Sequence, residues 1–214
     1  MNEVINFKKV SKKFGDNYVL KNLTFTIHDG EFVSIVGPSG AGKSTVLNIM
    51  GLLESYNSGE VSLLGDKVPR ADSRKATFLR RNTINYLFQS FALIEDRTVK
   101  DNLLLAMHFV KHSEKIDRIK EILKMVDLAD KFNSVVSTLS GGEKQRVALA
   151  RTLLKPGDII LADEPTGALD PALSETAFNL IKELQAKYKK TIVMVTHNME
   201  QAQQTDRIIE INKP

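Results

Sequence analysis

The chain has 214 residues, of which 42% are hydrophobic and 26% charged, and these proportions exclude an intrinsically disordered chain. It contains no cysteine, which excludes disulfide bonds and thiol chemistry. Its net charge of +4 comes from 30 basic and 26 acidic residues, and an excess this small and scattered argues against a nucleic-acid-binding protein.

The first part of the chain predicts mainly strands. Apolar and polar residues alternate over residues 4–10 and 20–27, as in two half-buried antiparallel strands. Residues 32–37 are almost wholly apolar, which is typical of a buried parallel strand, and a helix is expected at 43–53. A strand at 60–65, a short basic helix at 73–82 and a strand at 83–88 follow.

The middle of the chain has a different pattern. Residues 99–110 and 115–128 carry apolar side chains at helical spacing, so we expect a helical insert at about 98–155. The core then resumes with a strand at 158–163, a helix at 171–188 that has Pro171 in its first turn, and strands at 191–197 and 207–211.

A glycine-rich loop joins the predicted strand at 32–37 to the helix that follows it. Its sequence GPSGAGKST fits the phosphate-binding pattern G-x-x-x-x-G-K-[ST] of a P-loop, or Walker A motif. Backbone N–H groups would surround a phosphate, Lys43 would reach the β- and γ-phosphate oxygens, and Ser44 would bind Mg²⁺. The residues expected to hold the nucleotide are Gly37, Pro38, Ser39, Gly40, Ala41, Gly42, Lys43, Ser44 and Thr45.

These patterns predict one α/β domain over residues 1–214. It would have a P-loop NTPase core with a parallel sheet (about 1–97 and 156–214), an N-terminal antiparallel β subdomain and an inserted α-helical subdomain.

Polar residues stand at the ends of three predicted strands. Asp163 ends an apolar strand, where parallel sheets bind ligands, and is expected to bind Mg²⁺. Glu164 would activate the attacking water, with a solvated loop acid as the alternative. Since neighbours on a strand point in opposite directions, we expect the two carboxylates to have different tasks. His197 would contact the γ-phosphate or be structural, and Gln89 would bind Mg²⁺ or position water, although on spacing alone it is a polar loop residue.

A second glycine pair lies in LSGGEKQR, residues 139–146, where a helix is expected to begin. A free helix N-terminus is an anion site, equivalent to roughly +0.5 charge. The P-loop with Asp163 already meets the needs of one nucleotide, so this second site is useful mainly against the phosphate of another nucleotide.

In their order, these motifs resemble those of the ATP-binding cassette ATPases. The resemblance rests on GPSGAGKST, Gln89, LSGGE (139–143), IILADE (159–164), GALD (167–170) and His197, and it spans essentially the whole chain. It implies ATP and Mg²⁺ as cofactors and a head-to-tail homodimer that forms on ATP binding.

The resemblance also implies roles for further residues. Ser140, Gly141 and Gly142 of one chain would contact the γ-phosphate held by the P-loop of the other. Asp170 would link the two sites. Phe14, with Tyr18 as its rival, would stack on adenine, unless Phe14 belongs to the core.

The family further implies an ATPase subunit that powers a separate permease at the cytoplasmic face of the cell membrane. The helical insert and the loop around Gln89 would dock on the permease. No apolar run approaches the ~20 residues of a membrane-spanning helix, and the first ten residues lack a signal-peptide core. The motifs look most like those of lipoprotein-releasing, macrolide-export and lactococcin-972-type bacteriocin-export ATPases, which predicts an exporter.

Two other functions are alternatives to an exporter ATPase. One is an ABC ATPase that drives a transmembrane partner in signalling or cell-wall control. The other is a DNA-repair or ribosome-associated ATPase. The second is disfavoured because residues 46–138 carry no sustained heptads and the chain has one cassette.

Overall fold

The computed structural model describes residues 2–88, 90–108 and 114–214. Its antiparallel sheet has the strand order β2-β1-β4-β5. The strands are β1 (Glu3–Phe14), β2 (Asn17–His28), β4 (Ser58–Leu63) and β5 (Asp66–Lys67). The first two pair as predicted but are longer, because Gly15, in the left-handed region with φ of 59°, lets a two-residue turn join them directly.

Five parallel strands form the second sheet, in the order β6-β7-β8-β3-β9. They are β3 (Phe32–Val36), β6 (Ile84–Phe88), β7 (Ile159–Asp163), β8 (Thr191–Val195) and β9 (Arg207–Glu210). Every residue of β3 and β8 is buried, which explains their almost unbroken apolar sequences. The pairing is parallel throughout, so the carboxyl ends of these strands meet at one edge, where such sheets bind ligands.

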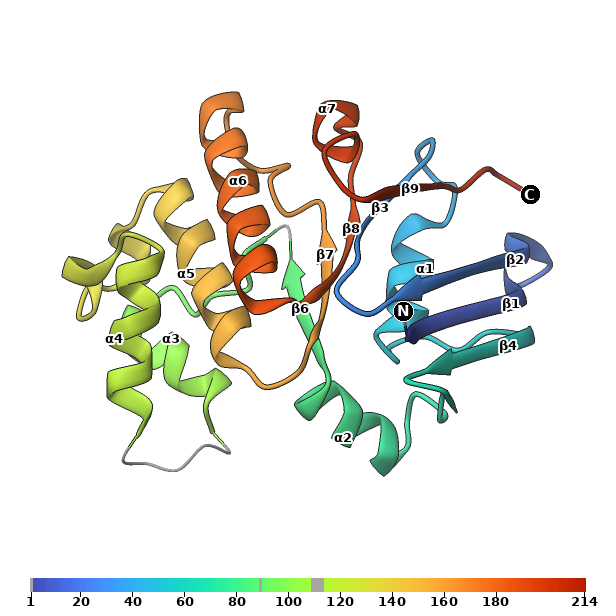
Figure 1. Cartoon of the computed structure of the whole chain (residues 1–214), viewed down its shortest axis with the longest axis horizontal. Helices are drawn as coiled ribbons and strands as arrows, with labels where there is room; N and C mark the ends of the chain where they lie inside the picture. Colours follow the sequence, from blue (N-terminus) through green and yellow to red (C-terminus); the bar gives the residue numbers. More distant parts are fainter. Residues whose placement is uncertain (1, 89, 109–113) are drawn as a thin grey trace.

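Helices cover both faces of the parallel sheet, as Figure 1 shows. They include α1 (Lys43–Met50), α2 (Arg74–Asn82), α5 (Gly141–Leu154), α6 (Pro171–Tyr188) and the short α7 (Met199–Ala202). Leu161 and Val193 face α1 and the antiparallel sheet, whereas Ile160 and Met194 face α5 and α6. This alternation follows from the two-residue period of a strand and confirms the predicted α/β P-loop fold.

A separate hydrophobic cluster lies in the middle of the chain. It involves α3 (Val99–Ala106), α4 (Lys115–Met125), the 3₁₀ turn Val136–Thr138 and one side of α5. A second 3₁₀ turn, Ala129–Lys131, follows α4 and buries none of its residues. Val147 and Ala150 of α5 belong to this cluster, but Ala148 and Leu149 belong to the core cluster beside the parallel sheet. Because α5 packs on both clusters, the division of the domain at residues 98 and 155 stays a prediction.

Helix α1 ends at Met50, three residues before the predicted end. Gly51 follows it, and a Cβ atom at Gly51 would lie 1.7 Å from the Tyr86 hydroxyl oxygen of β6. That hydroxyl donates a hydrogen bond to the Leu47 carbonyl over 2.9 Å. The sheet therefore holds the end of α1 at a distance that only glycine permits.

Candidate active site

The P-loop connects β3 to α1 at the ligand-binding edge of the parallel sheet. Gly40 and Gly42 have φ values of 77° and 90°, which disfavour other residues. A Cβ atom at Gly42 would also lie 2.8 Å from the Leu20 side chain and 2.9 Å from that of Val19. α1 begins with no side-chain cap and no acidic residue in its first turn, among the residues described. Its N–H groups and positive dipole end are therefore open to an anion.

Lys43 lies across the mouth of this loop. Its ammonium donates hydrogen bonds to the carbonyls of Gly37, at 2.8 Å, and Pro38, at 3.1 Å. These two bonds keep the charge beside the backbone N–H groups of the loop. An anion there would meet both kinds of donor.

Ser44 and Asp163 meet beside the P-loop. The Ser44 hydroxyl donates to Asp163 Oδ1 over 3.5 Å. Burial raises the pKa of Asp163, and the charge of Glu164 adds to this, while the Ser44 hydrogen bond opposes it. Within the described ranges no three His, Cys, Asp or Glu side chains form a metal site. Two hard oxygen donors fit Mg²⁺, which usually keeps waters and takes further ligands from phosphates. Gln89, the third predicted ligand, lies outside the described residues.

Glu164 and His197 form a close pair. His197 Nδ1 lies 2.7 Å from Glu164 Oε2. The Glu164 side chain is 19% exposed and that of His197 is 72% exposed. β7 ends at Asp163, and Glu164 has the left-handed φ of 47°. Both carboxylates line one cavity, because Glu164 is not part of the strand and does not follow its alternation. Their different tasks stay a prediction.

The cavity at this edge has a volume of about 520 Å³, within the range of small-molecule sites. Its lining contains Val19, Gly37, Ser39, Gly40, Gly42, Lys43, Ser44, Thr45, Asp163, Glu164, Val195 and His197. Of the predicted loop residues described here, Pro38 and Ala41 do not line it, and Ala41 is fully buried. The structure thus brings most of the predicted P-loop, metal and catalytic residues together.

The predicted adenine-binding aromatics lie outside this cavity lining. Phe14 is 50% exposed and Tyr18 44% exposed, so the core alternative for Phe14 is wrong. The Lys12 ammonium lies 4.7 Å from the Phe14 ring centroid, and the Lys13 ammonium 4.3 Å from that of Tyr18. The sequence reasoning missed Val19, which lines the cavity and carried no distinguishing signal. The choice between the two aromatics stays a prediction.

The second glycine pair lies at the N-terminus of α5. Ser140 caps this helix: its hydroxyl accepts from Glu143 N–H over 3.2 Å, and its own N–H donates to the Glu143 carboxylate over 2.8 Å. That backbone bond and Lys131 lower the pKa of Glu143. Ser140 and Gly141 are exposed, and in the described part of the chain none of residues 139–143 lines the P-loop cavity. The two anion sites of one chain are therefore separate.

Asp170 has a structural role in this chain. It caps α6 by accepting a hydrogen bond from Leu173 N–H over 3.0 Å. A Cβ atom added to Gly142 would lie 3.1 Å from the Leu173 side chain, so the start of α5 packs beside the start of α6. The structure thus places Asp170 near the second glycine pair and outside the P-loop cavity.

Comparison with known proteins identifies this arrangement. A family model described as "ABC transporter" matches residues 20–167. The uncharacterised ABC transporter ATP-binding protein MJ0796 of Methanocaldococcus jannaschii is 44% identical over 96% of this chain and 92% of that protein. The chain belongs to the ABC transporter family.

Two other relatives confirm the resemblance to lipoprotein-releasing and macrolide-export ATPases. The lipoprotein-releasing system ATP-binding protein LolD of Treponema denticola is 43% identical, over 94% of this chain and 88% of its own length. The macrolide export ATP-binding/permease protein MacB of Psychrobacter cryohalolentis is 41% identical over 90% of this chain. This chain spans only 29% of that longer MacB protein.

The solved structures include MJ0796 as a dimer in a post-hydrolysis state bound to ADP and Pi. It matches this ABC cassette with a TM-score of 0.85 and 41% identity, over 97% of this chain and 94% of that one. The present chain is accordingly an ATPase that uses ATP and Mg²⁺. None of the helices in its described part combines the length and apolar character needed to cross a bilayer.

Proposed function

We propose that the chain is the ATP-hydrolysing subunit of a multi-subunit membrane exporter, and that it powers a separate permease through ATP-driven head-to-tail dimerisation. The observation that carries the dimer is the separation of the two anion sites: no described residue of the 139–143 segment lines the P-loop cavity. In a head-to-tail pair, Ser140, Gly141 and Gly142 of each chain would meet the γ-phosphate at the partner's P-loop. The homologous MJ0796 has been solved as a dimer, which supports dimerisation of this chain.

The charged and polar residues of the proposed site have defined tasks. Lys43 and the P-loop N–H groups hold the phosphates, and Ser44, Asp163 and Gln89 hold Mg²⁺, which supplies charge neutralisation when bound. Glu164 would take a proton from the attacking water while the water oxygen bonds to the γ-phosphorus; the bond from the γ-phosphorus to the bridging oxygen would break and ADP would leave with that electron pair. His197 stays within hydrogen-bonding distance of Glu164 and holds a γ-phosphate oxygen.

The permease would dock on the segment that follows Gln89 and on the helical insert. Phe88, just before Gln89, and Ile94, within this segment, are 38% and 43% exposed, and Leu105 of α3 is 58% exposed. Arg151 of α5 donates a hydrogen bond to the Phe91 carbonyl over 2.8 Å and another to the Ala92 carbonyl. The segment is thus attached to α5, the helix that Ser140 caps.

Membrane fractionation tests the docking. A tagged Glu164→Gln chain at native expression level should co-purify, after mild detergent extraction, with one polytopic membrane protein. Glu95 makes an ion pair with Lys144 of α5 at 2.9 Å. Glu95→Lys should therefore reduce co-purification with the membrane protein while leaving the P-loop intact. Recovery of the chain only with ribosomes or nucleic acid contradicts the proposal.

Transport in vesicles separates the exporter from a signalling ATPase. The chain and its permease, reconstituted together, should accumulate a peptide, antibiotic or lipid-like substrate in an ATP-dependent manner. ATP hydrolysis by the complex without movement of any such substrate, together with control of a cell-wall enzyme, favours the signalling alternative.

A further inference from the structure

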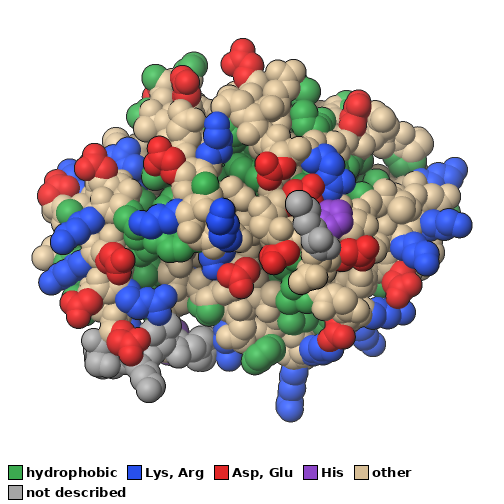
Figure 2. Space-filling view, in the orientation of Figure 1, with side chains coloured by type: hydrophobic (Ala, Val, Ile, Leu, Met, Phe, Trp, Pro, Cys, Tyr) green, Lys and Arg blue, Asp and Glu red, His purple; other side chains and the backbone are tan. Residues whose placement is uncertain are grey.

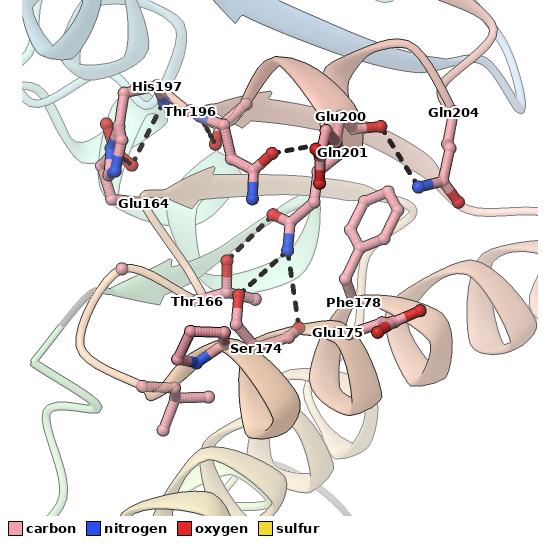
Figure 3. Close-up of a pocket in the computed structure, with 14 residues that line it drawn as sticks. Glu164, Thr166, Ser174, Glu175, Phe178, Thr196, His197, Glu200, Gln201 and Gln204 are labelled. Atoms are coloured by element: carbon pink, nitrogen blue, oxygen red, sulfur yellow. Dashed lines mark hydrogen bonds and ion pairs between the residues drawn. The ribbon is translucent and has the colours of Figure 1, made fainter.

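Gln201 is a buried amide between three elements near the active site. It lies in the short helix α7, four residues after His197, and only 5% of it is exposed. Its Oε1 accepts a hydrogen bond from the Thr166 hydroxyl over 2.9 Å. Its Nε2 donates to the Ser174 hydroxyl of α6 over 3.0 Å. Figure 3 shows the amide reaching from α7 toward both residues.

The two partners of Gln201 connect it to the turn that carries Glu164. Gly167 N–H donates to the Glu164 carbonyl over 3.0 Å, so Thr166 lies inside a tight turn that begins at Glu164. The other side of this turn is held by α5, because Gln145 Nε2 donates to the Pro165 carbonyl. The amides of Gln201 and Gln145 therefore hydrogen-bond to this turn from two sides, and the turn positions Glu164.

The start of α7 is held in the same way. Asn198 caps it by accepting from Gln201 N–H over 3.1 Å, and Asn198 N–H donates to the Thr196 hydroxyl over 3.0 Å. His197 lies between these two residues and is mostly exposed. Its imidazole contacts the Glu164 carboxylate through Nδ1. The position of α7 thus sets where His197 stands relative to Glu164.

We infer that Gln201 is a positioning residue for ATP hydrolysis, which fixes the spacing between His197 and Glu164 by joining α7 to the 164–167 turn and to α6. It is not among the residues that line the P-loop cavity. This inference rests on the proposed roles of Glu164 and His197. An apolar side chain would fill the same volume but would leave the buried Thr166 hydroxyl without this acceptor, so α7 and the turn would move apart.

The test compares ATPase kinetics of Gln201→Met with those of a matched control. Methionine keeps the length of the side chain and removes its hydrogen bonds to Thr166 and Ser174. Gln201→Met should lower kcat roughly tenfold, below the ~10²-fold that a 1 Å misplacement can cost, and leave KM within about twofold. The control is Gln204→Met. Gln204 lies two residues after the end of α7 and lines the same cavity as Gln201, the one drawn in Figure 3, but it bonds to the Glu200 carbonyl and to Lys182. Turnover is expressed per ATP-binding site, so a loss of folded protein does not imitate the effect.

A second pair of variants isolates the hydrogen bond and covers the case in which Gln201→Met does not fold. Thr166→Val removes only the hydroxyl, and its kcat should fall as in Gln201→Met, whereas Thr166→Ser should keep several-fold more turnover than Thr166→Val. Equal kcat values for these two variants, or a Gln201→Met kcat within twofold of wild type, overturn the inference. Wild-type turnover in His197→Ala would instead overturn the proposed role of His197.

Discussion

Glu164 reaches the nucleotide cavity because of its backbone conformation. A left-handed φ at a residue other than glycine costs on the order of 1–3 kcal/mol and persists only where its surroundings hold it. Here Glu164 N–H donates to the Val195 carbonyl over 3.0 Å, and the Glu164 carbonyl accepts from Gly167. The chain leaves the strand direction at this point, so the carboxylate turns toward the edge that also carries Asp163 and His197.

We expect Glu164→Gln to slow ATP hydrolysis by ~10²–10⁴-fold, the usual range for a positioned acid or base. Glutamine keeps the size and hydrogen-bonding capacity of the side chain but removes the base and one negative charge. ATP binding should hold or tighten, because less negative charge faces the γ-phosphate. Turnover and nucleotide affinity are measured together, with Glu175→Gln as the control, since Glu175 lies outside the P-loop cavity lining. Near-normal turnover in Glu164→Gln would mean that another group is the general base.

Asp163 combines a functional charge with a cost in stability. Burial raises its pKa, with help from Glu164, so the folded chain holds this proton more tightly than the unfolded chain does. Its contribution to the free energy of unfolding is therefore fully present below the ordinary Asp pKa of ~3.9 and is lost as the pH rises through the raised pKa. At neutral pH the ionised carboxylate destabilises the nucleotide-free protein.

Asp163→Asn should therefore raise the Tm of the nucleotide-free protein at pH 7. The difference from wild type should shrink as the pH falls toward the ordinary Asp range, where wild-type Asp163 is protonated too. The same variant should lose most of the Tm increase that Mg²⁺ with ATP gives to wild type, because the metal loses a charged ligand. Thermal melts at both pH values measure this, with Asp29→Asn as an exposed control. An unchanged or lower Tm at pH 7 would contradict the prediction.

At the scale of elements, the sequence predicts the helices and strands whose hydrophobic pattern is long enough to be recognised. β3 and β8 are recognisable because every residue is buried, and α6 runs from Pro171 to Tyr188 as predicted because its cap and period agree. β5 has two residues and α7 four, which is too short for either period to appear. The site was predictable where a motif fixes the backbone, as in the P-loop. The contacts of Gln201 were not, because they join segments that are adjacent only in the fold.

The helix α5 is the element with two tasks. Its capping box stabilises the helix at Ser140, while the exposed Ser140 and Gly141 leave its positive end facing outward. Replacing a capping serine by alanine costs about 0.5–2 kcal/mol of stability. Any substitution at Ser140 must therefore be compared with Ser140→Ala to separate the lost cap from an effect on the neighbouring chain.

Ser140→Arg should abolish ATP hydrolysis in trans while leaving ATP binding to the P-loop intact. A bulky cation would occupy the space beside the partner's γ-phosphate and block closure, an effect that Ser140→Ala lacks. Mixing Ser140→Arg with the inactive Lys43→Ala should restore part of the activity, since one site of the mixed dimer has an intact P-loop and an intact Ser140. If Ser140→Arg loses nucleotide affinity as sharply as Lys43→Ala does, both anion sites serve one chain.

At the scale of the whole molecule, charge does not drive two chains together. Basic and acidic side chains are mixed over the face in Figure 2, and the net charge of +4 makes two copies repel each other weakly. We expect the nucleotide to supply a favourable term. A γ-phosphate between the P-loop of one chain and the α5 N-terminus of the other would contact donors from both, and would link dimerisation to ATP by mass action.

We therefore expect the isolated chain to be a monomer without nucleotide and a dimer with ATP when hydrolysis is blocked. Light scattering on Glu164→Gln with saturating ATP and Mg²⁺ measures this directly. ADP should not support the dimer, because it lacks the γ-phosphate that joins the two halves. Adding Ser140→Arg to Glu164→Gln should return the protein to monomers at the same ATP occupancy. Increasing salt should also weaken the dimer, since its central contacts are between phosphate charge and exposed N–H or ammonium donors. A Glu164→Gln chain that stays monomeric with bound ATP, or that dimerises equally with ADP, would contradict the composite site.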